Sequence, residues 1–185
     1  RTKAGPAEAV ENRKPILQVE NLSILSDKGF LALDDVSFSI QQGEIFGIAG
    51  VSGNGQQELA EVLAGLRKAE GGKVILEEKE ITHSSSLVRW QLGIGYIPSE
   101  RTEVGSIGDF SLVENVTMNF YFDQDYVRHG IVDYGRIREL TEELVSEYNV
   151  AAPSTDIKAK SLSGGNLQKL ILARVLSRKP RLVIA

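Results

Sequence analysis

The sequence of 185 residues contains no cysteine. Disulfide bonds, zinc sites built on thiolates and cysteine nucleophiles are therefore excluded, because each requires a thiol. No apolar run approaches the roughly 20 residues that a membrane-spanning helix needs, and the first residues lack the apolar core of a signal peptide. A net charge of −4 provides no broad basic surface, so nucleic acid is not expected as a partner.

What the sequence does contain is a series of short apolar strands and amphipathic helices. Residues 1–15 are rich in Ala, Glu, Lys, Arg and Pro without apolar periodicity, so we interpret them as a linker after another domain. Strands are predicted at residues 16–20, 31–40, 44–49, 73–76, 94–97 and 181–185. Helices are predicted at residues 56–66, 84–92 and 111–118, and from Asp133 and Ser163 onward.

Two glycine-rich turns precede predicted helices. The first glycine-rich turn, residues 50–57, reads Gly-Val-Ser-Gly-Asn-Gly-Gln-Gln, and the second, residues 162–168, reads Leu-Ser-Gly-Gly-Asn-Leu-Gln. A helix start of this kind directs free backbone N–H groups and the positive end of the helix dipole at one point, which favours an anion. Together the turns suggest a nucleotide phosphate tail held from two sides. The alternative is a pair of turns without a ligand, with Ser163 as a simple helix cap.

The order of these motifs resembles the ATPase domain of ATP-binding-cassette (ABC) transporters. Residues 44–49 and the first glycine-rich turn are similar to the Walker A region, and the second glycine-rich turn is similar to the family's signature motif. Residues 94–98 resemble the strand that leads into the Q-loop, and residues 181–185 resemble the strand before the Walker B carboxylate. More narrowly, residues 96–101 resemble the variant Q-loop of the second cassette in tandem-cassette importers of simple sugars or nucleosides.

The resemblance implies an α/β fold with a P-loop NTPase (RecA-like) core, an antiparallel β-subdomain and an α-helical subdomain at about residues 108–165. Residues 16–185 would form part of one ATPase domain and end at the Walker B strand. The nucleotide-binding candidates are Gly50, Ser52, Gly53, Asn54, Gly55, Gln56 and Gln57. The signature candidates are Leu162, Ser163, Gly164, Gly165, Asn166 and Gln168, and the Q-loop-like candidates are Ser99 and Glu100.

The first glycine-rich turn departs from a complete P-loop, which reads G-x-x-x-x-G-K-[ST]. Gly50 and Gly55 keep the spacing, but Gln56 and Gln57 replace the lysine and the hydroxyl residue. The backbone still offers N–H groups to phosphates, whereas the cation and the hydroxyl ligand to Mg²⁺ are missing. We therefore expect weak or partner-dependent binding of ATP and Mg²⁺, and neither a metal ligand nor a catalytic residue in this chain. The family's adenine-stacking aromatic is also missing, with Phe30 as a displaced substitute.

In the family two cassettes meet head to tail. In a tandem-cassette protein this implies that the second glycine-rich turn acts on ATP held by the first cassette, which belongs to the same polypeptide. The implied function is the second, degenerate nucleotide-binding domain of an importer of sugars or nucleosides. Its partners would include transmembrane permease subunits at the cytoplasmic face of the membrane. We expect no ATP hydrolysis by these residues alone, and we expect an exposed sheet edge that permits a non-native homo-oligomer.

Three other functions remain to be weighed. A non-enzymatic nucleotide-sensing or protein-docking module would use the same turns without catalysis. A Rossmann dinucleotide enzyme is disfavoured, because the glycines at 47, 50, 53 and 55 do not form G-x-G-x-x-G. A chromosome-maintenance or repair ATPase of the same superfamily is disfavoured by the acidic charge balance and by the sequence of residues 96–101.

Overall fold

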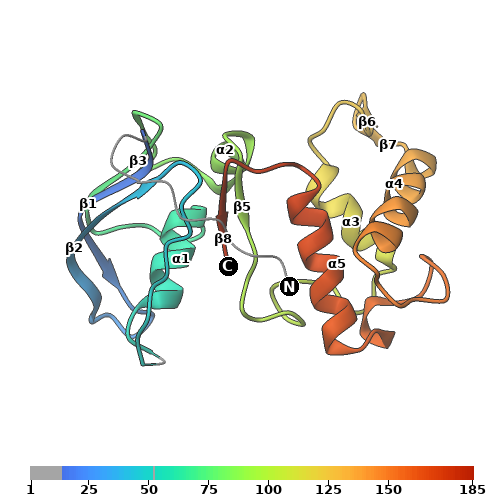
Figure 1. Cartoon of the computed structure of the whole chain (residues 1–185), viewed down its shortest axis with the longest axis horizontal. Helices are drawn as coiled ribbons and strands as arrows, with labels where there is room; N and C mark the ends of the chain where they lie inside the picture. The colour runs from blue at the N-terminus through green and yellow to red at the C-terminus, as the bar shows by residue number, and fades with distance from the viewer. Residues whose placement is uncertain (1–13, 52) are drawn as a thin grey trace, which may run out of the picture. The chain divides into compact units, whose positions relative to one another are not determined.

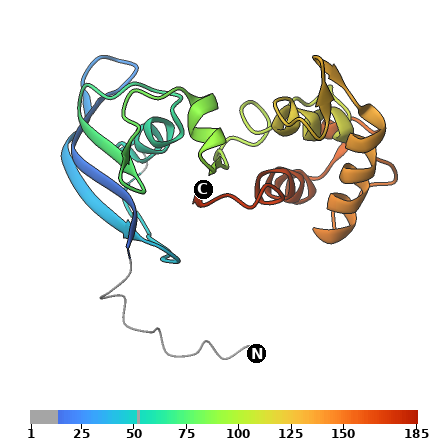
Figure 2. The same cartoon turned by 90° about the horizontal axis from the view of Figure 1, so that it is seen from above.

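The computed structural model describes residues 14–51 and 53–185. These residues fall into two compact units, one that ends at Leu92 and one that begins at Gly93 (Figures 1 and 2), and each unit is described by itself. Residues 1–13 of the predicted linker lie outside the described residues, and Pro15 already begins the first strand. No helix in the described ranges is long and apolar enough to cross a membrane.

The first unit is built on an antiparallel sheet with the strand order β2-β1-β3-β4. The central strand β1 buries Leu17, Val19, Leu22 and Ile24, each at most 2% exposed. Helix α1 lies against this sheet (Figure 2). Its buried apolar stripe includes Val62. The elements are β1 (Pro15–Leu25), β2 (Leu31–Gln41), α1 (Gln56–Ala64), β3 (Gly71–Leu76), β4 (Lys79–Glu80) and α2 (Ser86–Gln91).

A buried arginine joins the two helices of this unit. The side chain of Arg89 on α2 is 1% exposed, and it has no carboxylate among its hydrogen-bond partners. All five of its N–H donors are used instead on backbone carbonyls. The acceptors are the carbonyl oxygens of Val62, Leu63, Ile81, Thr82 and Ser84, at 2.7–3.2 Å. Arg89 thus adds side-chain donors to carbonyls in the last turn of α1, where the Gly65 N–H also donates to the Val62 carbonyl oxygen at 3.0 Å.

The prediction of a strand at residues 44–49 is wrong for the structure as described. The chain there forms no strand, and Ile45 and Ile48 are 99% and 51% exposed. The apolar run is typical of a strand that is buried on both faces, but no strand in the described residues pairs with it. Phe46 alone finds an aromatic neighbour, because its ring stacks on that of Phe38 at 5.2 Å.

The second unit combines a helical cluster with a short parallel strand pair. Strands β5 and β8 pair in parallel, with Ile94 opposite Leu182. Helices α3, α4 and α5 surround a core that includes Val116, Ile137 and Ile171, each at most 1% exposed. The elements are β5 (Ile94–Tyr96), α3 (Leu112–Phe120), β6 (Val127–Arg128), β7 (Ile131–Val132), α4 (Tyr134–Glu147), η2 (Ala159–Ser161), α5 (Gly164–Leu176) and β8 (Leu182–Ile184).

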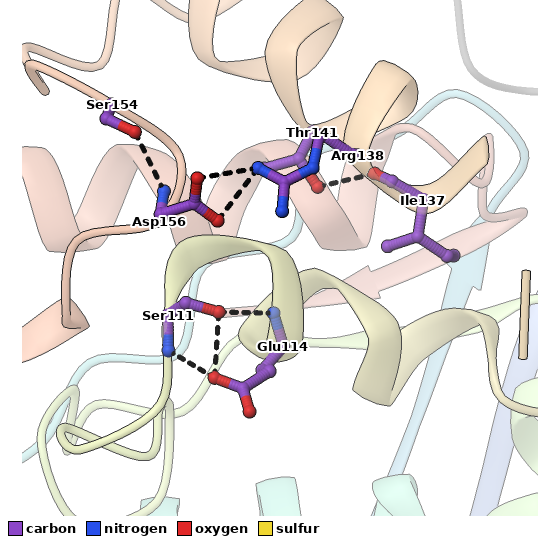
Figure 3. Close-up of polar contacts among 7 residues, drawn as sticks. All are labelled: Ser111, Glu114, Ile137, Arg138, Thr141, Ser154 and Asp156. Carbon is purple, nitrogen blue, oxygen red and sulfur yellow. Dashed lines mark hydrogen bonds and ion pairs between the residues drawn. The ribbon is translucent and has the colours of Figure 1, made fainter. Parts of the chain in front are cut away.

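Side-chain caps fix where these helices begin. Ser111 and Glu114 form a reciprocal capping box at the start of α3, with the two cap bonds at 3.1 and 2.7 Å (Figure 3). Asp133 caps α4, as the sequence predicts. On α4 the Arg138 guanidinium lies 2.8 Å from the carboxylate of Asp156, which holds the following loop against the helix (Figure 3).

Candidate functional site: two glycine-rich helix starts

The first glycine-rich turn leads directly into α1. Gly55 is the N-cap residue and has a φ of +92°, in the left-handed region where glycine is favoured. A Cβ at this position would lie 2.6 Å from the Leu33 side chain and 2.7 Å from the Ala32 carbonyl oxygen. The prediction of a helix start at this turn is therefore confirmed. Ser52, one of the nucleotide-binding candidates, lies outside the described residues.

The two glutamines of the turn are held by intramolecular hydrogen bonds. Gln56 folds back over Gly50, and its amide Nε2 donates to the Val51 carbonyl oxygen at 3.4 Å. Gln57 donates along the helix to the Glu61 carboxylate at 2.9 Å. Neither side chain supplies a positive charge or a hydroxyl. The described residues of the turn therefore fit a triphosphate only in part, through backbone N–H groups, because Gln56 and Gln57 supply neither the cation nor the hydroxyl of a complete P-loop.

A cavity of about 460 Å³ opens beside the first glycine-rich turn. Phe30, the displaced aromatic of the sequence prediction, lines it together with Gly53 and Asn54. The Ser26 hydroxyl in the same lining is buried and has no hydrogen-bond partner among the described residues. Asp27 at the rim is tied to α1 through Arg67, which lies 2.8 Å from the carboxylates of both Asp27 and Glu61. The cavity thus combines an aromatic ring with an unpaired hydroxyl.

The second glycine-rich turn begins α5, and this prediction is confirmed as well. Ser163 is the N-cap, and its hydroxyl accepts hydrogen bonds from the backbone and side-chain nitrogens of Asn166 at 3.4 and 3.1 Å. Ser163, Gly164 and Gly165 are exposed, and a Cβ on Gly165 would meet nothing within 4 Å. The first-turn N–H groups have no intrahelical acceptor. Ser163 caps the N–H of Asn166, so the backbone N–H groups of Gly164 and Gly165 are the ones that can meet an anionic ligand.

Asn166 has a different role from its neighbours in this turn. Its side-chain oxygen accepts a hydrogen bond from the Ala151 backbone N–H at 3.0 Å, so it anchors the turn to the loop after α4. Leu162 is half-buried against the helical core, whereas Gln168 is exposed on α5. Among the signature candidates, Ser163, Gly164, Gly165 and Gln168 therefore face solvent.

The Q-loop-like residues belong to the same unit as the second glycine-rich turn. Ser99 and Glu100 are exposed, and the Glu100 carbonyl oxygen accepts a hydrogen bond from the Gly105 N–H at 2.8 Å. The neighbouring Arg101 reaches further, because its guanidinium donates to the Gly164 carbonyl oxygen at 3.2 Å. The structure therefore brings Arg101, rather than Ser99 or Glu100, into contact with the second glycine-rich turn.

The burial of one arginine in α5 has no counterpart in the sequence. Arg174 lies in the last turn of the helix, where a cation complements the helix dipole. The structure buries Arg174 at 7% exposure, and desolvation lowers the pKa of its guanidinium to about 10. No sequence signal separates this arginine from the more exposed Arg178, because both lie in the same basic helix end.

Solved structures identify the fold as that of an ATP-binding cassette. A nucleotide-free ATP-binding cassette from an ABC transporter superimposes with a TM-score of 0.74 at 25% identity, covering 92% of this chain and 68% of that one. A dimeric cassette in a post-hydrolysis state, bound to ADP and Pi, gives a TM-score of 0.72 at 21% identity, covering 90% and 72%. The fold class is thus the α/β P-loop NTPase fold with an antiparallel sheet, as the resemblance implies.

Residues 33–185 match the ABC transporter family, and the chain belongs to that family. It is 41% identical over 180 residues to the glucose import ATP-binding protein TsgD13 of Haloferax volcanii, covering 96% of this chain and 33% of that protein. It is 37% identical over 170 residues to the guanosine import ATP-binding protein NupO of Bacillus subtilis, covering 92% and 33%. The chain therefore spans about a third of the length of these curated relatives.

Proposed function

We propose that this chain is part of the second, degenerate nucleotide-binding domain of an importer of sugars or nucleosides. The names of its relatives, which include glucose and guanosine import ATP-binding proteins, support this solute class. In this proposal the domain contacts the first cassette of the same chain and transmembrane permease subunits at the cytoplasmic face of the membrane. ATP binding and hydrolysis at the shared interface are coupled to transport.

The observation that carries the proposal is the contrast between the two glycine-rich turns. In the second turn, Ser163, Gly164 and Gly165 are exposed at a helix N-terminus and meet the requirements for binding a γ-phosphate from another cassette. In the first turn, Gln56 and Gln57 lack the charge and the hydroxyl, and both are engaged within the chain. The second turn therefore acts in trans on a competent site, while the first belongs to an impaired one.

The division of roles is tested in the intact protein by placing a carboxylate on the second turn. A side chain fits at Gly165 without displacing a neighbour, so Gly165→Asp retains the fold but repels the γ-phosphate. We expect the ATPase rate to fall by at least about tenfold, which corresponds to about 1.4 kcal/mol of lost transition-state stabilisation.

The matched control adds the same charge to the first turn of another helix. Ser86 is exposed at the start of α2, so Ser86→Asp should leave the ATPase rate unchanged. Gln56→Ala should also retain most of the activity, because the proposal assigns catalysis to the partner's P-loop. Equal losses in Gly165→Asp and Ser86→Asp, or full activity in both, would refute the trans role.

The second candidate is a nucleotide-sensing or protein-docking module without catalysis. The absence of a lysine and a hydroxyl at Gln56 and Gln57 favours it, because both side chains bond within the chain and neither supplies the charge that catalysis needs. Under this alternative the intact protein binds MgATP without turning it over. Phosphate release that disappears in Gly165→Asp would exclude it.

A further inference from the structure

The loop formed by residues 100–107, between β5 and α3, lies along helix α5. Near its start, the Arg101 guanidinium donates to the Gly164 carbonyl oxygen in the first turn of the helix, at 3.2 Å. Further along, Gly105 is buried against the helix so closely that a Cβ would lie 2.8 Å from Cδ1 of Ile171. The 100–107 loop therefore touches α5 at its glycine-rich start and again about two turns later.

Arg174 holds Gly105 of the loop against α5 by a buried hydrogen bond. Its side chain is 7% exposed, and its two terminal nitrogens donate to the carbonyl oxygens of Gly105 and, at 3.2 Å, of Asn115 on α3. Asn115 in turn holds the end of the loop, since its side chain accepts from the Ile107 N–H at 2.9 Å and donates to the Ile107 carbonyl at 3.0 Å. One cation thus links α5, α3 and the 100–107 loop.

Burying the Arg174 guanidinium in this core has a high cost in desolvation free energy. A buried charge without a carboxylate partner loses hydration that backbone carbonyls replace only in part. Arg89 in the other unit uses all five donors on carbonyls, whereas the Nε of Arg174 is buried without a partner among the described residues. An apolar side chain would fill the space at lower cost, so the benefit of Arg174 lies in what it holds in place.

We propose that Arg174 is a positioning residue that makes the 100–107 loop and the second glycine-rich turn move as one body. A partner that displaces the loop then displaces the turn, with Arg174 as the buried link and Arg101 as the exposed one. The effect on ATP use rests on the proposed function, whereas the mechanical coupling does not. Replacing Arg174 by Met leaves the Gly105 carbonyl without its donor but also removes an unpaired buried N–H, so we expect the fold to persist.

The coupling is tested by hydrogen–deuterium exchange of the intact protein. Arg174→Met should speed exchange at least about fivefold both in residues 100–107 and in the first turn of α5, with the exchange of α4 unchanged. Arg174→Lys should restore part of the protection, because a lysine offers donors but not the fork of a guanidinium. Arg128→Met, which removes an exposed arginine in β6, is the matched control and should change neither segment.

Each outcome bears on the proposal. Faster exchange in the loop alone, or in neither segment, would overturn it. If Arg174→Met does not fold, Gly105→Ala strains the same contact from the loop side and must loosen the first turn of α5 for the proposal to survive. If both segments loosen and the ATPase kcat falls with little change in KM, both proposals stand. If both loosen but ATPase activity is unaffected, the coupling stands and the trans role of the turn is wrong.

Discussion

Restoring the missing charge to the first glycine-rich turn should restore nucleotide affinity. In Gln56→Lys the new ammonium replaces an amide that makes a neutral hydrogen bond to the Val51 carbonyl at 3.4 Å, a long contact that costs little to release. A charge-assisted hydrogen bond contributes about 1.5–3 kcal/mol, against about 0.5–1.5 for a neutral one. The gain of about 1–1.5 kcal/mol predicts that the Kd for MgATP falls about 5- to 12-fold.

The assay is calorimetric titration of the intact protein with MgATP, compared between wild type and Gln56→Lys. Adding Gln57→Ser supplies the hydroxyl ligand for Mg²⁺ and should tighten binding further. This substitution removes the hydrogen bond to Glu61, but the Glu61 carboxylate remains paired with Arg67, so the cost to the fold is small. Gln42→Lys adds the same charge at an exposed position beyond β2 and controls for long-range attraction. If Gln56→Lys binds no more tightly than Gln42→Lys, the loss of the lysine is not what weakens this site.

The remaining predictions concern stability, measured by denaturant unfolding of the intact protein. Arg89→Lys removes the guanidinium that bonds to five backbone carbonyls and should cost about 3–5 kcal/mol, whereas Lys28→Arg on the surface should cost nothing measurable. Ser111→Ala loses the capping box of α3 and should cost about 1 kcal/mol, so a cost near zero would show that the cap is dispensable. Gly55→Ala should cost at least about 1 kcal/mol, because its φ is +92° and Leu33 and the Ala32 carbonyl lie too close for a Cβ; wild-type stability would contradict the close packing.

Much of the local structure could be predicted because it depends on neighbours in sequence. Caps act over three residues, so Asp133 and Ser163 mark the starts of α4 and α5. The two glycine-rich turns are local in the same sense, and both precede helices as expected. The family resemblance added the antiparallel sheet, which no local signal specifies.

The features that were missed depend on long-range packing. Whether residues 44–49 form a strand depends on neighbouring strands that can pair with them, and the described residues provide no such strand. Arg89 and Arg174 look like other basic helix residues, yet each bonds to carbonyls from distant segments. Arg101 lies in a polar loop with no sequence signal that connects it to the second glycine-rich turn, and only the fold brings it to Gly164.

The central claim is that the second glycine-rich turn contacts the γ-phosphate of ATP held by another cassette. The most direct measurement is photolabelling of the intact protein with ATP that carries a photoreactive group on its γ-phosphate, followed by mass spectrometry of the peptides. The account predicts label within residues 162–168 that is competed by MgATP and lost in Gly165→Asp. Label confined to residues 50–57, with none in residues 162–168, would contradict it.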